Sequence, residues 1–153
     1  MKAVTGSTWT FQMIIFFILI FACFLTLVLS YNKAYQIKNR MLTIIEKYEG
    51  VTPVSQEYIN DFIANKSYNN KGKCPSGWTG ALDYEGTYEE VQINKEYLYC
   101  FKASRKNKKV YYEVKVFYRF NLPLIGEIFN YSIDGTTKTF VGADDRIGVL
   151  LWM

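Results

Sequence analysis

The chain has 153 residues, of which 50% are hydrophobic, and a formal net charge of +4. Its length suits one domain, or one domain with an appendage, and its scattered Lys and Arg residues disfavour nucleic acid as a partner. The chain contains no histidine, which removes the commonest general base, and its sequence holds no phosphate-binding glycine loop or cluster of metal ligands. We therefore expect a protein that is not an enzyme and that needs no cofactor.

An apolar stretch follows the short N-terminal segment 1–8. Residues 13–29 include no charged side chain, and the stretch 9–30 is about long enough for one helix across a bilayer. A secretory signal peptide is the alternative, but its apolar region is usually shorter, and no small-x-small cleavage motif follows this one. The sequence therefore predicts a retained transmembrane helix over 9–30, which anchors the chain in the cell membrane by a single pass.

The helix is expected to continue beyond the membrane over residues 31–50. No proline or glycine interrupts it before Gly50, which supplies a stop signal. Apolar side chains recur at steps close to 3.6 residues and form one face, made of Ala34, Ile37, Met41, Ile44, Ile45 and Tyr48. This face has two interpretations. It covers a sheet of the same chain, or it packs against the helices of sister subunits, and different sides of the helix allow both.

The remainder of the chain, 51–153, is predicted to form an α+β domain with an antiparallel sheet. After Thr52-Pro53, Ser55 is the expected N-cap of a short helix that runs through Ala64. The apolar face of this helix contains Tyr58, Ile59, Phe62 and Ile63. Residues 65–80 are rich in Asn, Gly, Lys and Ser, a composition typical of a loop.

From about Thr87 the hydrophobic pattern alternates, as it does in strands. A polar turn dense in cations contains Lys102, Arg105, Lys106, Lys108 and Lys109. It leads into a strand with one long apolar face, made of Val110, Tyr112, Val114, Val116, Tyr118 and Phe120. The segments 128–133 and 136–141 flank Asp134-Gly135, a strong signal for a two-residue hairpin turn. We therefore expect three or four antiparallel strands, with the long helix laid against them.

The cysteines bear on the compartment of the domain. Cys23 lies inside the apolar stretch, whereas Cys74 and Cys100 suit one disulfide in an oxidising compartment. Two unpaired buried thiols in a cytosolic domain are the alternative. The positive-inside rule favours that cytosolic placement, because three cations closely follow the span: Lys33, Lys38 and Arg40. Since long domains can be translocated despite flanking charge, we expect an extracytoplasmic domain.

The segment 122–129 is unusually apolar for a region between strands. It contains Leu122, Leu124, Ile125, Ile128 and Phe129. At about eight residues it is too short to span a bilayer, so the remaining interpretations are core packing and a docking surface for another subunit. We expect a crossover that packs under the Ala34–Tyr48 face of the helix, with subunit docking as the alternative.

Two parts of the sequence resemble a known group of proteins. The first part is a strand with apolar residues at 114, 116, 118 and 120, which is followed by Leu-Pro-Leu-Ile-Gly at 122–126, Ile128-Phe129 and a polar hairpin. This order looks like the C-terminal part of the TadE/TadG-like minor pseudopilins of tight-adherence (Tad) systems. The N-terminal span that continues as an amphipathic helix is similar to the type IV pilin plan, a long helix packed on a small antiparallel sheet. The resemblance covers the span and residues 110–141.

The resemblance implies a non-enzymatic subunit of a Tad-type pilus or a related secretion or adhesion machine. Its partners would be the bilayer, other pilin-like subunits and an assembly platform. Pilin-like precursors carry a glutamate five residues after a glycine cleavage site, whereas this chain has Gly6-Ser7 at that site and Phe11 at the glutamate position. We therefore expect a minor or accessory subunit. The alternatives are a membrane-anchored extracytoplasmic binding module outside any filament, and an inward-facing subunit of a membrane complex.

Overall fold

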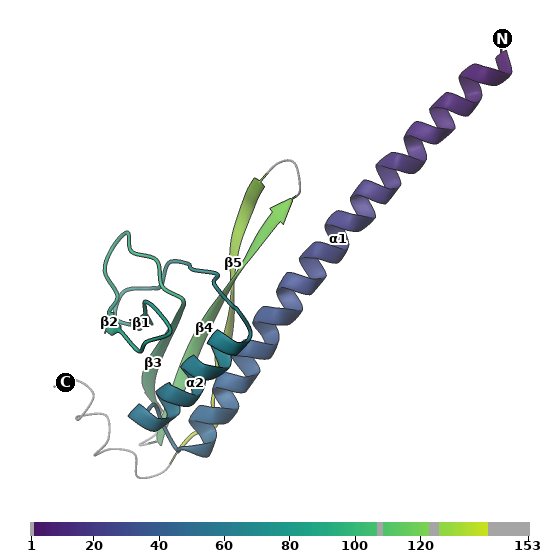
Figure 1. Cartoon of the computed structure of the whole chain (residues 1–153). Coiled ribbons are helices and arrows are strands. Elements are labelled where there is room, and N and C mark those ends of the chain that lie inside the picture. The colour runs from purple at the N-terminus through teal and green to yellow at the C-terminus, as the bar shows by residue number, and fades with distance from the viewer. Residues whose placement is uncertain (1, 107–108, 123–125, 141–153) are drawn as a thin grey trace.

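The chain folds into one long helix joined to a small sheet domain (Figure 1). The computed structural model describes residues 2–106, 109–122 and 126–140. Within them, a long N-terminal helix packs on a five-stranded antiparallel sheet. The predicted class, α+β with a long N-terminal helix on a small antiparallel sheet, is confirmed.

Helix α1 (Lys2–Lys47) has 46 residues and starts before the predicted span. It ends where Glu49 adopts a φ of 52° and Gly50 a φ of 151°. The Gly50 N–H donates to the Ile45 carbonyl oxygen at 2.9 Å, which satisfies one of the last carbonyls of the helix. A Cβ at Gly50 would lie 3.0 Å from Tyr112 Oη, so the turn brings the backbone close to the sheet.

Helix α2 (Pro53–Asn65) starts three residues earlier than the predicted cap at Ser55 implies. Its N-cap is Thr52, whose Oγ1 accepts from the Ser55 N–H at 3.2 Å, while Ser55 Oγ accepts from the Thr52 N–H at 2.7 Å. Ser55 is therefore the third helical residue of a capping box and not the cap itself. On the predicted apolar face, Ile59 and Ile63 are buried, whereas Tyr58 is exposed.

The sheet contains strands β1 (Thr79–Ala81), β2 (Tyr88–Glu90), β3 (Tyr99–Lys106), β4 (Lys109–Leu122) and β5 (Gly126–Thr136), in the order β2-β1-β3-β4-β5. All neighbours are antiparallel. Strand β1 includes two residues of the predicted loop. Its Gly80 is required because a Cβ there would lie 2.2 Å from Cδ1 of the Tyr97 ring.

The predicted hairpin turn at Asp134-Gly135 is wrong. Both residues lie inside β5, where Gly135 pairs with Val114 and Asp134 with Lys115. The long partner strand β4 offers a continuous ladder, which outweighs the local turn preference. Gly135 instead allows α1 to approach, since a Cβ there would lie 2.8 Å from Leu42 Cδ1. The strands reverse between Leu122 and Gly126.

The main core lies between the two helices and one face of the sheet. Helix α1 contributes Ala34, Ile37, Met41, Ile44 and Ile45, and β4 contributes Val110, Tyr112, Val114 and Val116. Fully burying one such large aliphatic side chain contributes about 1.5–3 kcal/mol. A smaller cluster on the opposite side contains Tyr97, Cys100 and Phe117. The second half of α1 is therefore an integral part of the domain.

Candidate functional site

The first half of α1 carries the most distinctive surface of the molecule. Its large apolar side chains are exposed from Trp9 to Leu29, with Phe17 at 71% and Leu29 at 69%. In Figure 1 this half projects beyond the sheet domain toward the N-terminus. Among the described residues, α1 is the one helix long and apolar enough to cross a membrane. It is compatible with contact with a lipid bilayer and fits a single-pass anchor.

The second half of α1 presents the predicted amphipathic face to the chain's own sheet. Ala34 and Ile37 are fully buried, and Met41, Ile44 and Ile45 are 1–5% exposed. Tyr48 is half-buried and stacks on Tyr58, with 5.6 Å between the ring centroids. Because the sheet covers this face, its side chains are not available to a sister helix. The exposed apolar side chains of α1 lie in its first half.

Four tyrosines meet at the boundary between the two halves of α1. The Tyr31 ring stacks on Tyr35 at 6.2 Å and meets the edge of Tyr118 at 5.7 Å, and Tyr118 stacks on Tyr131 at 5.6 Å. Tyr118 and Tyr131 are paired residues of β4 and β5. We call Tyr31, Tyr35, Tyr118 and Tyr131 the tyrosine cluster. The sequence analysis missed it, although Tyr31 and Tyr35 are one helical turn apart, just after the apolar stretch.

Cations beside this boundary contact the domain. Lys33 Nζ donates to the Ser67 carbonyl oxygen at 3.2 Å, and Lys38 Nζ lies 4.5 Å from the centre of the Tyr35 ring. Arg119 Nη2 donates to the Lys71 carbonyl oxygen at 3.1 Å and pairs with Glu96 at 3.0 Å. These contacts join α1 and β4 to the loop after α2. The apolar half therefore continues from a structured base and not from a flexible linker.

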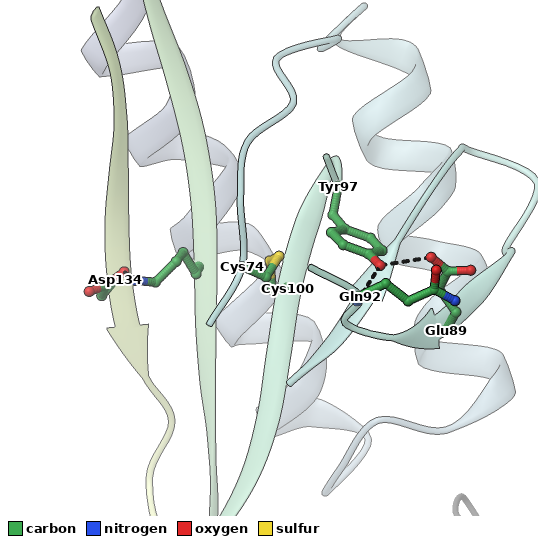
Figure 2. Close-up of a disulfide and its surroundings, with 7 residues drawn as sticks. Cys74, Glu89, Gln92, Tyr97, Cys100 and Asp134 are labelled. Atoms are coloured by element: carbon green, nitrogen blue, oxygen red, sulfur yellow. Dashed lines mark hydrogen bonds and ion pairs between the residues drawn. A yellow bond between two sulfur atoms is a disulfide. The ribbon is translucent and has the colours of Figure 1, made fainter. Parts of the chain in front are cut away.

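The disulfide between Cys74 and Cys100 joins the loop before β1 to strand β3. Figure 2 shows it close to Tyr97, which lies in the same small apolar cluster as Cys100. Tyr97 Oη donates to Glu89 Oε1 at 2.7 Å and accepts from the Gln92 N–H at 2.9 Å (Figure 2). The disulfide suits an extracytoplasmic domain, because such bonds persist in oxidising compartments.

A buried polar group lies beneath α2. Asn60 Oδ1 is 2.9 Å from Tyr99 Oη and 3.2 Å from Tyr88 Oη, and the two hydroxyls are 2.8 Å apart. Burial raises the pKa of both tyrosines, that of Tyr99 well above its ordinary value. The phenols are thus neutral hydrogen-bonding groups at physiological pH. An open depression beside them carries three carboxylates, Glu57, Asp61 and Glu85.

The structure separates the other residues singled out in the sequence. Leu122 pairs with Gly126 at the end of the β4–β5 ladder, while Leu124 and Ile125 lie outside the described residues. The β4 residues from Val110 to Val116 cover the Ala34–Tyr48 face, and the predicted crossover at 122–129 includes residues outside those that the structure describes. The basic residues Lys102, Arg105, Lys106 and Lys109 lie where β3 meets β4, and Lys108 lies outside the described residues. Because β4 runs from that end toward the tyrosine cluster, the basic end lies far from the exposed half of α1 (Figure 1).

Comparisons with protein-family models, curated proteins and solved structures found no significant match. The likeness to the Tad-type pseudopilins therefore rests on the sequence pattern and stays a prediction. Within the parts of the chain that the structure describes, no three His, Cys, Asp or Glu side chains are grouped to hold a metal. What the arrangement offers is an exposed apolar helix joined to a structured domain.

Proposed function

We propose that the protein is a single-pass membrane protein, and that it serves as a minor or accessory pilin-like subunit of a Tad-type pilus or a related secretion machine. One observation carries this proposal. A single 46-residue helix is exposed and apolar in its first half and forms part of the domain core in its second half. An anchor that only tethered a domain would not need to be continuous with that core.

The exposed half of α1 supports assembly as well as anchoring. Its apolar side chains require an apolar environment, and both lipid and a bundle of sister helices provide one. Because α1 continues into the domain core without a break, a helix packed among sister helices would hold its sheet domain in a defined orientation on the outside. Phe11 at the glutamate position supports an accessory role over that of a major subunit.

The proposed orientation places the sheet domain outside the cytoplasm. The Cys74–Cys100 disulfide supports it, whereas the cations after the span oppose it. An impermeant maleimide applied to intact cells tests both points in a Cys23→Ser background. We expect no labelling before reduction and labelling of both cysteines after a membrane-impermeant reductant. Labelling that needs permeabilised cells and no reductant would contradict the orientation.

Shearing tests the assembly role. We expect part of the protein in sheared surface material when the other components of its machine are present. The double variant Phe17→Ala with Leu25→Ala changes the shape of the exposed surface of α1 but keeps it apolar. We expect it to insert in the membrane normally and to reduce the fraction of the protein in the sheared material. The matched control is Gln36→Ala, an exposed polar position on the second half. Complete retention with the membrane would support the alternative, a membrane-anchored extracytoplasmic binding module.

A further inference from the structure

An open depression lies between the first turns of α2 and the loop that joins β1 to β2. Its volume is about 270 Å³, whereas a drug-sized ligand occupies a pocket of about 300–1,000 Å³. The depression therefore suits a single side chain of a partner better than a whole cofactor. We call it the acidic depression, and its lining includes Glu57, Asn60 and Asp61 of α2, Tyr84 and Glu85 of the loop, and Tyr88 of β2.

Three carboxylates give the acidic depression its charge. Glu57 and Asp61 lie one helical turn apart on α2, and Glu85 comes from the loop. All three are exposed. None of the ion pairs among the described residues involves them. The negative charge is therefore not neutralised within the described part of the chain, and a cation from outside can reach it.

One polar side chain at the depression is more than nine-tenths buried and has an unused donor. Asn60 is 7% exposed, and its Oδ1 accepts from the hydroxyls of Tyr88 and Tyr99. Its Nδ2 has no hydrogen-bond partner among the described residues. A Cβ at Gly86, which also lines the depression, would lie 3.4 Å from this nitrogen. Because no fully buried side-chain N or O atom of the described residues lacks a partner, Nδ2 opens into the depression and is available to a ligand.

Hydrogen bonds of the fold hold the lining in place. Tyr84 Oη donates to the Tyr68 carbonyl oxygen, which fixes the Tyr84 ring. Asp83 Oδ1 accepts from the N–H groups of Glu85 and Thr87, each at 3.1 Å. These two bonds order the loop that carries the third carboxylate. The depression is therefore largely formed before a ligand arrives, which lowers the entropy that binding costs.

The groups of the acidic depression suit a cation that is attached to a carbonyl group. The carboxylates attract an ammonium or guanidinium group, and the rings of Tyr84 and Tyr88 add cation–π attraction. Asn60 Nδ2 donates to an oxygen acceptor. A lysine or arginine residue within a polypeptide carries both the cation and the acceptor. A metal ion fits less well, because no three carboxylates of the described residues are grouped to hold one.

The surface beside the depression indicates a protein as the source of this cation. Val54 and Tyr58 are 49% and 53% exposed and lie one turn apart on α2. With 100° between successive residues, their stripe neighbours that of Glu57 and Asp61 around the helix. A polypeptide covers this apolar surface as well as the charged one, whereas a small amine does not. In Figure 1, α2 lies against the second half of α1, away from the projecting half, so a partner reaches it without contacting the apolar stretch.

We propose that the acidic depression binds a lysine or arginine residue of a partner protein. The cation lies among the carboxylates of Glu57, Asp61 and Glu85. Asn60 Nδ2 donates to a carbonyl oxygen of the same segment, and the exposed apolar pair on α2 packs against its neighbouring side chains. The proposal goes beyond the proposed function and depends neither on the membrane anchor nor on assembly into a filament.

Nuclear magnetic resonance of the ¹⁵N-labelled full chain, with its disulfide intact, in micelles of a non-ionic detergent tests the proposal. The first probe is the peptide acetyl-Ala-Lys-Ala-amide. The second is the same peptide with norleucine, which is apolar, in place of lysine, and the third is butylammonium, which has no carbonyl group. We expect the lysine peptide to shift the side-chain amide of Asn60 and the backbone amides of 57–61 and 84–88 in a saturable way. The norleucine peptide should cause no such shift, and butylammonium should bind several-fold more weakly.

Variants that keep the shape of the side chains test the role of the charge. The triple variant Glu57→Gln, Asp61→Asn, Glu85→Gln should bind the lysine peptide about tenfold more weakly, since each exposed charge contributes little by itself. The single variant Asp61→Asn should weaken binding by a smaller factor. Its matched control is Glu90→Gln, an exposed carboxylate of β2 outside the depression, which removes the same charge and should leave the affinity unchanged.

Four outcomes would overturn the proposal. They are the absence of a saturable shift with the lysine peptide up to about 10 mM, equal shifts with the norleucine peptide, and unchanged affinity in the triple variant. The fourth is equal affinity for butylammonium, which would show a site for free amines and not for a protein. None of these results changes what is expected from thiol labelling or shearing, so the proposed function stands or fails separately.

Discussion

Shortening Ile37 to alanine should measure how strongly α1 holds the sheet. Ile37 is fully buried in the main core. The change removes about three methylene equivalents, worth about 0.8 kcal/mol each, or about 2.4 kcal/mol in total. The cavity left behind adds to this loss, and measured costs of such truncations are about 2–5 kcal/mol. Alanine has a higher helix propensity than isoleucine, which offsets a few tenths of a kcal/mol. We therefore expect the free energy of unfolding to fall by about 3 kcal/mol.

The assay is urea unfolding of the full chain in detergent micelles, followed by the near-ultraviolet circular dichroism of the buried tyrosines. The micelle covers the exposed half of α1, so the transition reports the sheet domain. The control is Gln36→Ala, the preceding and exposed position, which should change the free energy of unfolding by less than about 0.5 kcal/mol. A loss below about 1 kcal/mol for Ile37→Ala would show that the site is not the close-packed core that this magnitude assumes.

Three further changes test other parts of the fold. Gly80→Ala places a Cβ 2.2 Å from the buried Tyr97 ring, and urea unfolding should show a loss of about 1–3 kcal/mol from overpacking. Thr52→Ala removes the N-cap of α2 and should cost about 1 kcal/mol, whereas Thr52→Ser should cost less, because it keeps the hydroxyl that accepts from Ser55. Burial raises the folded-state pKa of Tyr99 above its ordinary value of 10.0. Stability from this group is therefore complete below about pH 10 and falls as the pH rises above it, since the unfolded chain then releases a proton that the folded chain retains.

Each of these expectations has an outcome that contradicts it. Unchanged stability of Gly80→Ala would mean that the Tyr97 ring can move aside without losing its packing. Equal losses of stability for Thr52→Ala and Thr52→Ser would show that the hydroxyl of residue 52 does not stabilise the start of α2. For the tyrosines, the phenolate absorbance and the urea midpoint are followed together from neutral to alkaline pH. Full ionisation of the folded protein at about pH 10 would refute the burial argument.

The sequence by itself determined α1 and the class of the fold. The uncharged apolar stretch and the 3.6-residue repeat that follows it both describe one helix, because no glycine or proline interrupts them before Gly50. The alternation from 110 to 118 likewise predicts strand β4, and its apolar face lies in the core. These are local patterns, in which each residue's preference depends on neighbours only a few positions away.

Tertiary structure decided that Asp134-Gly135 lies inside a strand and which tyrosines come together beside α1. Asp134-Gly135 has the local preference of a turn, but β4 pairs with β5 from Glu113 to Leu122, and a Cβ at Gly135 would lie 2.8 Å from Leu42 Cδ1 of α1. Strands β4 and β5 therefore stay paired through this dipeptide and as far as Leu122 and Gly126. The tyrosine cluster depends on the same register, since Tyr118 stacks on its strand partner Tyr131 and meets Tyr31, which lies far away in the sequence. Such pairings depend on long-range geometry, which no local pattern encodes.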